Sequence, residues 1–244
     1  MAGTGITRRR AIGAACALAA IGAMGGLALC GSRAEVTLPS DSDGEAPVAD
    51  VWEDLLSPYP DAVGWLRVAG TRVDVPLMQA TEGDPDFWLT HGPDGSRDGE
   101  GSVYLDSRCS LTSAAAMAYG HHIGDTGRAL SDVHLAYEQS VLDGIGDMTL
   151  YARSTGEARA LSPVFALSVD KSFGDIQRFG FADDTEFRDW LGSLLSKASA
   201  RVGGADDVVE SASRAMTLVT CSSERAGRRA RTLLTFCECE RGGA

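Results

Sequence analysis

The stretch AMTLVTCSSERAGRRARTLLTF, residues 215–236, decides the fold of this 244-residue chain. It holds two apolar runs, 215–221 and 231–236, whose leucine, valine and threonine content is typical of strands. A polar, arginine-rich segment separates them. If the two strands pair in an antiparallel hairpin, Cys221 at the end of the first lies across from Arg231 at the start of the second.

Further strand-like runs precede this pair, and no strand–helix alternation indicates a parallel sheet. They are VGWLRV (63–68), TRVDVPLM (71–78), GSVYLD (101–106), AAAMAYG (114–120), MTLYAR (148–153) and PVFALSV (163–169). Helical periodicity predicts a short helix at 51–56 and another at 184–200, where Asp183 and Glu186 can form a capping box. Many short strands with one helix before the penultimate strand predict a mainly β fold, a barrel with peripheral helices.

The N-terminal segment differs in composition from the rest of the chain. Three arginines at 8–10 precede twenty residues without a charge, 11–30. This pattern predicts an uncleaved membrane anchor at 1–30, although TRRRAIG loosely resembles a twin-arginine export signal and LALC a lipoprotein box. Residues 31–47 are polar and turn-rich and form a spacer, so a catalytic domain at 48–244 would lie outside the cytoplasm.

Charge and cysteine content restrict the function. The formal net charge of −12 argues against a nucleic-acid-binding protein, because binding phosphates requires clustered cations. Four cysteines follow the apolar segment, and their spacing gives no disulfide framework: Cys109, Cys221, Cys237 and Cys239. Cys221 is therefore predicted to be a free thiol at a strand end, open to a substrate.

A nucleophilic thiol needs partners, and the chain offers two kinds. At neutral pH only a few per cent of an ordinary cysteine is thiolate, so a nearby imidazole is required. His121 follows Gly120, where an apolar strand breaks, and such a position faces a cleft. A guanidinium held at the start of a strand, as at Arg231, could bind a substrate carbonyl or its developing oxyanion.

These elements together resemble the sortases, membrane-anchored cysteine transpeptidases of Gram-positive bacteria. They are TLVTC (217–221), an arginine ten residues later that opens a strand, and the upstream YGHH (119–122). The resemblance is closest to class B, because residues 60–79, GSVYLDSR and AYGHHIGDTG follow in that class's order. The predicted helix before the cysteine strand also lies where class B carries an extra helix. The similarity covers roughly residues 50–240.

The resemblance implies a closed β-barrel and a role for each motif residue. Cys221 would be the nucleophile, His121 the acid–base partner, and Arg231 the residue that orients the substrate or stabilises the oxyanion. His122 and Thr220 would support them near the substrate. The implied substrate is a C-terminal sorting motif of a secreted protein, and the acceptor is an amine of a peptidoglycan precursor or a pilin lysine. This chemistry needs no metal or organic cofactor.

Three other interpretations of the same residues stay open. An enzyme like the L,D-transpeptidases would place histidine and glycine directly before the cysteine, where this chain has Val219 and Thr220. An inactive sortase-like binding module would not require the cysteine, histidine and arginine that the chain retains. A zinc site is also conceivable, although cysteines two apart are not a usual zinc spacing. Its ligands would be His121, His122, Cys237 and Cys239.

Overall fold

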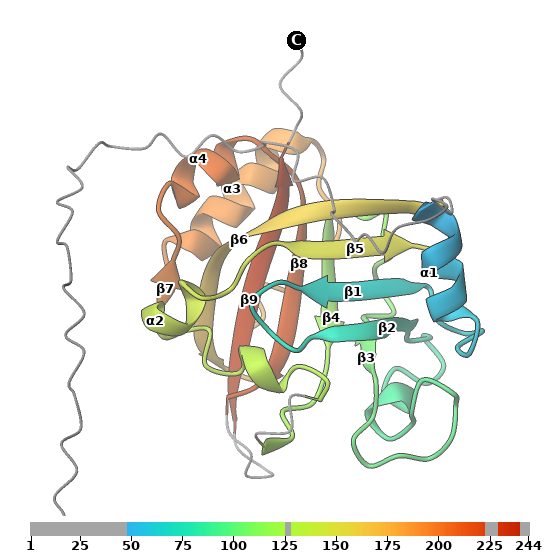
Figure 1. Cartoon of the computed structure of the whole chain (residues 1–244). Helices are drawn as coiled ribbons and strands as arrows, with labels where there is room; N and C mark the ends of the chain where they lie inside the picture. The colour runs from blue at the N-terminus through green and yellow to red at the C-terminus, as the bar shows by residue number, and fades with distance from the viewer. Residues whose placement is uncertain (1–47, 125–127, 223–228, 240–244) are drawn as a thin grey trace, which may run out of the picture.

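The structure, a computed structural model, describes residues 48–124, 128–222 and 229–239. Its strands are β1 (Gly64–Val68), β2 (Asp74–Gln79), β3 (Val103–Leu105), β4 (Ala115–Tyr119), β5 (Met148–Ala152), β6 (Glu157–Asp170), β7 (Ala200–Arg201), β8 (Ala212–Cys221) and β9 (Ala230–Cys239). Eight of these strands form a barrel in the order β5-β1-β2-β3-β4-β8-β9-β6 (Figure 1). Pairing of β5 with β6 closes the barrel. The short strand β7 pairs with β6 outside this order. The mainly β, closed-barrel fold predicted from the sequence is confirmed.

Short helices cover parts of the barrel. They are α1 (Val48–Leu56), α2 (Gln139–Leu142), α3 (Asp184–Leu195) and α4 (Ala205–Glu210), with 3₁₀ turns at Phe87–Leu89 and Ser131–Val133. The prediction that the second long helix extends to residue 200 is wrong, because α3 ends at Leu195 and the chain turns to pair β7 with β6. Asp183 caps α3 by accepting from the Glu186 N–H at 2.9 Å. The Glu186 carboxylate accepts from the Ala182 N–H instead of completing the predicted box.

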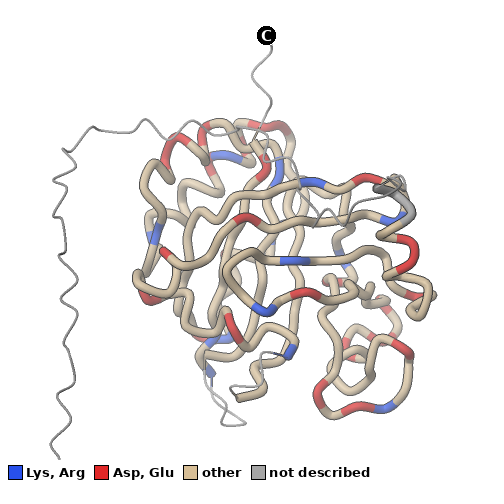
Figure 2. Tube along the Cα trace, in the orientation of Figure 1, with Lys and Arg blue, Asp and Glu red and all other residues tan. Residues whose placement is uncertain are grey.

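The predicted anchor at 1–30 and spacer at 31–47 lie outside the described residues. Among the helices at 48–124, 128–222 and 229–239, none has the length and apolar character needed to cross a membrane. Figure 2 shows lysine and arginine dispersed among the acidic residues of the same ranges.

Two strand pairs are parallel, which the sequence pattern did not indicate: β2 with β3, and β4 with β8. In the second pair Tyr119 lies opposite Val219, and the Gly120 N–H donates to the Val219 carbonyl at 3.1 Å. Parallel strands end at the same edge, so the chain that leaves β4 lies beside the end of β8. The antiparallel β9 begins at that edge too. Three chain segments therefore converge at one rim of the barrel.

The side chains of β9 alternate between two apolar layers. Leu234 and Phe236 are fully buried in the barrel interior, whereas Leu233 packs outside it with Phe187 and Leu191 of α3. The strand predicted at residues 231–236 is confirmed as part of β9. Because both faces of the strand are packed, the rim at which it begins is held rigidly. That rim carries the candidate site.

Candidate active site

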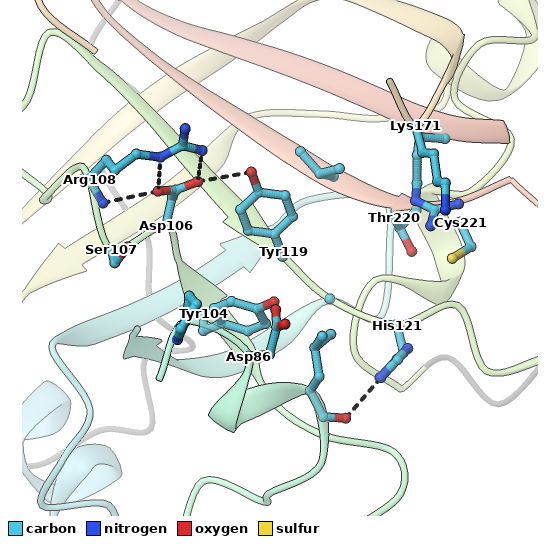
Figure 3. Close-up of a pocket in the computed structure, with 15 residues that line it drawn as sticks. Asp86, Tyr104, Asp106, Ser107, Arg108, Tyr119, His121, Lys171, Thr220 and Cys221 are labelled. Atoms are coloured by element: carbon cyan, nitrogen blue, oxygen red, sulfur yellow. Dashed lines mark hydrogen bonds and ion pairs between the residues drawn. The ribbon is translucent and has the colours of Figure 1, made fainter. Parts of the chain in front are cut away.

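A cavity of about 540 Å³ lies against the barrel rim (Figure 3). Its lining includes Cys221 from the end of β8, His121 after β4, and Arg231 near the start of β9. The structure thus brings together all three residues that the sequence singled out for chemistry. They are separated along the chain and meet because of the parallel β4–β8 pair.

Cys221 and Arg231 face each other across the hairpin. The β8–β9 register pairs their Cα positions, which confirms the pairing expected from the sequence. Cys221 is partly exposed and its thiol is free. The Arg231 guanidinium lines the same cavity and donates to the Ala230 carbonyl through Nη1 at 3.0 Å. A thiol and a cationic hydrogen-bond donor therefore share the mouth of one cavity.

His121 is oriented by its surroundings. Its Nε2 lies 2.9 Å from the Leu89 carbonyl oxygen. A carbonyl can only accept, so Nε2 carries a proton and Nδ1 is the nitrogen that can take up or release one. The backbone is fixed by the Leu130 N–H, which donates to the His121 carbonyl at 3.1 Å. Figure 3 shows His121 and Cys221 on the same side of the cavity.

Gly120 is required for this placement of His121. A Cβ at Gly120 would lie 2.8 Å from Cγ of Leu130, which is fully buried in the barrel interior. Gly120→Ala should therefore lower the free energy of unfolding by about 1–3 kcal/mol through overpacking. Urea denaturation measures this loss. Gly83→Ala is the control, because no atom lies within 4 Å of a Cβ there. Equal stability of the two variants would contradict the close packing described.

The two supporting residues predicted from the sequence have different surroundings. Thr220 is 3% exposed, lines the cavity, and its hydroxyl has no hydrogen-bond partner among the described residues. His122 does not line the cavity, and its ring stacks on that of His134 with centroids 3.8 Å apart. The Thr220 hydroxyl is thus buried in the cavity wall, whereas His122 packs against His134 outside the cavity lining.

The other described cysteines are in environments unsuited to nucleophilic chemistry. Burial raises the pKa of Cys109, and it raises the pKa of Cys237 to about 12. Cys239 is disulfide-bonded, which the spacing of the cysteines did not predict. The four residues considered as zinc ligands do not form a metal site. The described ranges contain no group of three or more histidine, cysteine or acidic side chains placed to hold a metal.

The polar, arginine-rich segment that separates the two apolar runs precedes β9. Arg225 and Arg228 lie outside the described residues. Arg229 is exposed but paired, because its Nε and Nη2 donate to the Asp170 carboxylate at 2.7 and 2.6 Å. Hydrogen bonds from Arg229 and Ser172 hold the pKa of Asp170 below its ordinary value. The sequence pattern could not show this pair, because it depends on the register of β6 against β9.

A polar cluster at the other side of the cavity was missed from the sequence. Asp106, Arg108 and Tyr119 line it and are joined by hydrogen bonds (Figure 3). The exposed Lys171 lines the cavity as well. Asp106 directly follows β3, and an arginine stands two residues later. That spacing was the available signal, because an aspartate at a strand end commonly hydrogen-bonds the backbone two residues on.

Comparison with known proteins places these features in context. No family model matches the chain. Sortase B of Listeria monocytogenes is 24% identical over 184 residues, which cover 73% of this chain and 70% of the relative. Sortase B of Staphylococcus aureus is 25% identical over 172 residues, covering 70% and 67%.

Solved structures show the same fold. The crystal structure of Clostridium perfringens sortase B has a TM-score of 0.64 at 22% identity and covers 77% of this chain and 99% of its own. A Staphylococcus aureus sortase B–substrate complex has a TM-score of 0.63 at 22% identity and covers 78% and 84%. The resemblance predicted from the sequence motifs is confirmed.

Proposed function

We propose that this chain is a cysteine transpeptidase of the sortase type, similar to sortase B, and that it acts through a thioester on Cys221. The acyl donor is the C-terminal sorting motif of a secreted protein. The acceptor is an amine of a peptidoglycan precursor or of a pilin lysine. The observation that carries this proposal is the convergence of Cys221, His121 and Arg231 at one cavity.

The residues divide the reaction into two acyl transfers. The Cys221 thiolate attacks a backbone carbonyl carbon of the donor, and Arg231 hydrogen-bonds the oxyanion that forms. His121 gives a proton to the departing amine as the carbon–nitrogen bond breaks, which leaves the thioester. The acceptor amine then attacks the thioester carbonyl and loses a proton to His121. A new amide bond forms, and the Cys221 thiol is restored.

The location of the enzyme is part of the same proposal. The basic residues at 8–10 and the uncharged segment 11–30 support a single membrane anchor, with the catalytic domain at 48–244 on the extracytoplasmic face. The C-terminal sorting motif of a secreted protein would be accessible to the enzyme on that face. Protease treatment of intact cells tests the orientation, and digestion confined to lysed cells would contradict it.

Trapping of the thioester tests the activity directly. The full-length chain is incubated with a set of fluorogenic pentapeptides, in each of which the residue at one position is fixed. Triglycine is the acceptor amine. Intact-mass spectrometry and peptide mapping then identify the acylated residue. We expect an acyl adduct on Cys221 that triglycine removes with formation of a new amide. Peptide cleavage without an adduct on Cys221 would contradict the proposal.

Arg231 should contribute strongly to turnover. Removal of one preorganised oxyanion donor costs roughly a hundred- to a thousandfold in kcat, so Arg231→Ala should lose that factor. Lysine keeps the charge but lacks the planar fork of donors, so Arg231→Lys should stay badly impaired. Steady-state transpeptidation, with folding checked by circular dichroism, measures both variants.

Arg229 provides the matched control for Arg231. It lies two residues earlier but does not line the cavity, and its exposed ion pair with Asp170 contributes little to stability. Arg229→Ala should therefore stay within about threefold of the wild-type rate. Normal turnover in Arg231→Ala combined with a large loss in Arg229→Ala would show that the assigned arginine is wrong.

A further inference from the structure

Each of the three residues assigned to the proposed reaction is directly followed by a polar residue that does not line the cavity. These three neighbours are His122, Ser222 and Thr232. Successive side chains of an extended chain face opposite ways, so a residue beside one that lines the cavity is directed elsewhere. All three neighbours are joined, directly or through one another, to residues 128–136, here called the bracket segment.

The bracket segment is itself fixed to the barrel. Its side chains Leu130, Val133 and Ala136 are at most 1% exposed and pack in the barrel interior. The Asp132 carboxylate accepts from the Arg72 backbone N–H at 2.7 Å and from Arg72 Nη2 at 2.6 Å. The segment is therefore held both from inside the barrel and from the loop between β1 and β2.

The backbone that carries His121 is attached to the bracket segment at two points. The Leu130 N–H donates to the His121 carbonyl at 3.1 Å. Two residues after His121, the Ile123 N–H donates to Oγ of Ser131 at 2.8 Å. Ser131 is 2% exposed, and its own proton is used in a hydrogen bond to the Arg128 carbonyl. The chain that leaves His121 therefore cannot shift without breaking these hydrogen bonds.

The thiol side of the site is attached to the same segment through two hydroxyls. Oγ1 of Thr232 donates to the His134 carbonyl, and Oγ of Ser222 lies 3.0 Å from Oγ1 of Thr232. A carbonyl can only accept, so the single proton of Thr232 is committed to His134, and Ser222 must donate to Thr232. The ring of the same His134 stacks on that of His122. His134 thus connects the residue after the histidine with the residue after the cysteine.

The direction of these hydrogen bonds limits what the two hydroxyls can do. The Ser222 proton is directed to Thr232 and is not available to the adjacent sulfur of Cys221. Thr232 is 1% exposed and does not line the cavity. Both residues can therefore affect the reaction only through the positions of the groups that do line it.

We propose that Thr232 is a positioning residue for the acyl transfer on Cys221. Through Ser222 it holds the end of β8, and through the His134 carbonyl it holds the bracket segment. The separation between the thiol and the imidazole of His121 is then fixed before a peptide binds. Such preorganisation acts on the maximal rate, because misplacement of a reacting group by about 1 Å can cost roughly a hundredfold. The proposal rests on the function proposed for Cys221.

Thr232→Val tests this role, because valine keeps the shape of threonine and removes the hydroxyl. The preferred pentapeptide is the member of the fluorogenic set that acylates the wild-type enzyme fastest. Intact-mass spectrometry follows adduct formation at increasing concentrations of this peptide. We expect the maximal rate to fall roughly ten- to a hundredfold and the half-saturating concentration to stay within about threefold. Thr232→Ser keeps the hydroxyl, so its maximal rate should stay within about threefold of wild type.

Thr235→Val is the matched control. Thr217 and Thr235 also form a buried cross-strand hydroxyl pair of the β8–β9 hairpin, with oxygens 3.0 Å apart, and neither lines the cavity. This variant loses the same group from the same hairpin, so it should lose thermal stability and keep the wild-type maximal rate. Ser222→Ala provides a second test that does not depend on the folding of Thr232→Val. Ser222 is partly exposed, and its loss should lower the maximal rate about three- to tenfold.

A second background separates positioning from general damage to the fold. In His121→Ala there is no imidazole to position, so the addition of Thr232→Val should change the slow adduct rate by less than about threefold. An equal loss in both backgrounds would overturn the proposal, because Thr232 would then support the fold and not the geometry of the site.

The outcomes separate the positioning role from the reaction. Absence of any adduct on Cys221 in the wild-type chain would contradict the proposed function. Normal wild-type adducts with unchanged maximal rates in Thr232→Val and Ser222→Ala would overturn the positioning role alone. An equal loss of rate in Thr235→Val would also overturn it, because any buried hydroxyl of the hairpin would then have the same effect. A loss in Thr232→Val and Ser222→Ala that disappears without His121 supports the role.

Discussion

Cys221→Ala should yield a folded protein with no acyl-enzyme and no transpeptidation. Without the sulfur no thioester can form, and none of the other described thiols can replace it. Cys109 and Cys237 are buried, and burial raises the pKa of both, so neither supplies thiolate at neutral pH. Intact-mass spectrometry after incubation with the pentapeptides measures the adduct, and amide formation with triglycine measures turnover.

The buried thiols supply the controls for this experiment. Cys109→Ala and Cys237→Ala remove side chains from packed positions, so each should lower stability while the acyl adduct still forms. Thermal unfolding and adduct formation are measured on the same samples. An active Cys221→Ala enzyme would show that another residue is the nucleophile.

His121→Ala should lose about 10²- to 10⁴-fold in kcat/KM, the range that general acid–base groups contribute. The variant lacks the imidazole that we propose stabilises the thiolate and protonates the departing amine. His122→Ala should lose a smaller factor, because His122 does not line the cavity and its ring stacks on that of His134. Kinetic measurements of both variants with the preferred pentapeptide give the comparison.

A pH profile shows whether the effect of His121 is chemical. The wild-type enzyme should have a bell-shaped dependence of kcat/KM on pH, and His121→Ala should lose one limb of it. His122→Ala should keep both limbs. If His122→Ala loses the limb and the larger factor, the second histidine is the acid–base partner.

Local sequence patterns predicted most of the barrel because strand signals are local. The apolar run at 231–236 and the strand break at Gly120 are each signals within one short segment, and the structure bears both out. The length of β6 was underestimated. It begins at Glu157, six residues before the apolar run at 163–169, because its first part pairs with β5 and β9 while remaining largely exposed.

Features that depend on distant pairing could not be read from the sequence. The parallel β4–β8 pair has no local signature, yet it brings His121 to the rim that carries Cys221. The Arg229–Asp170 ion pair and the hydrogen bonds around Asp106 arise from strand register and loop conformation. The roles of Cys221, His121 and Arg231 were predicted from motif order, and the mutants above test them.

The β4–β8 pair also has a consequence for how the enzyme matures. Ala115 pairs with Ala215, so these strands are separated by 100 residues, and closing such a long loop slows folding. During synthesis the histidine leaves the ribosome well before the thiol, and the arginine follows last. The nascent chain therefore carries no assembled catalytic centre until nearly the whole barrel has been made. Any acyl transfer that requires all three residues must therefore wait until β9 has joined the barrel.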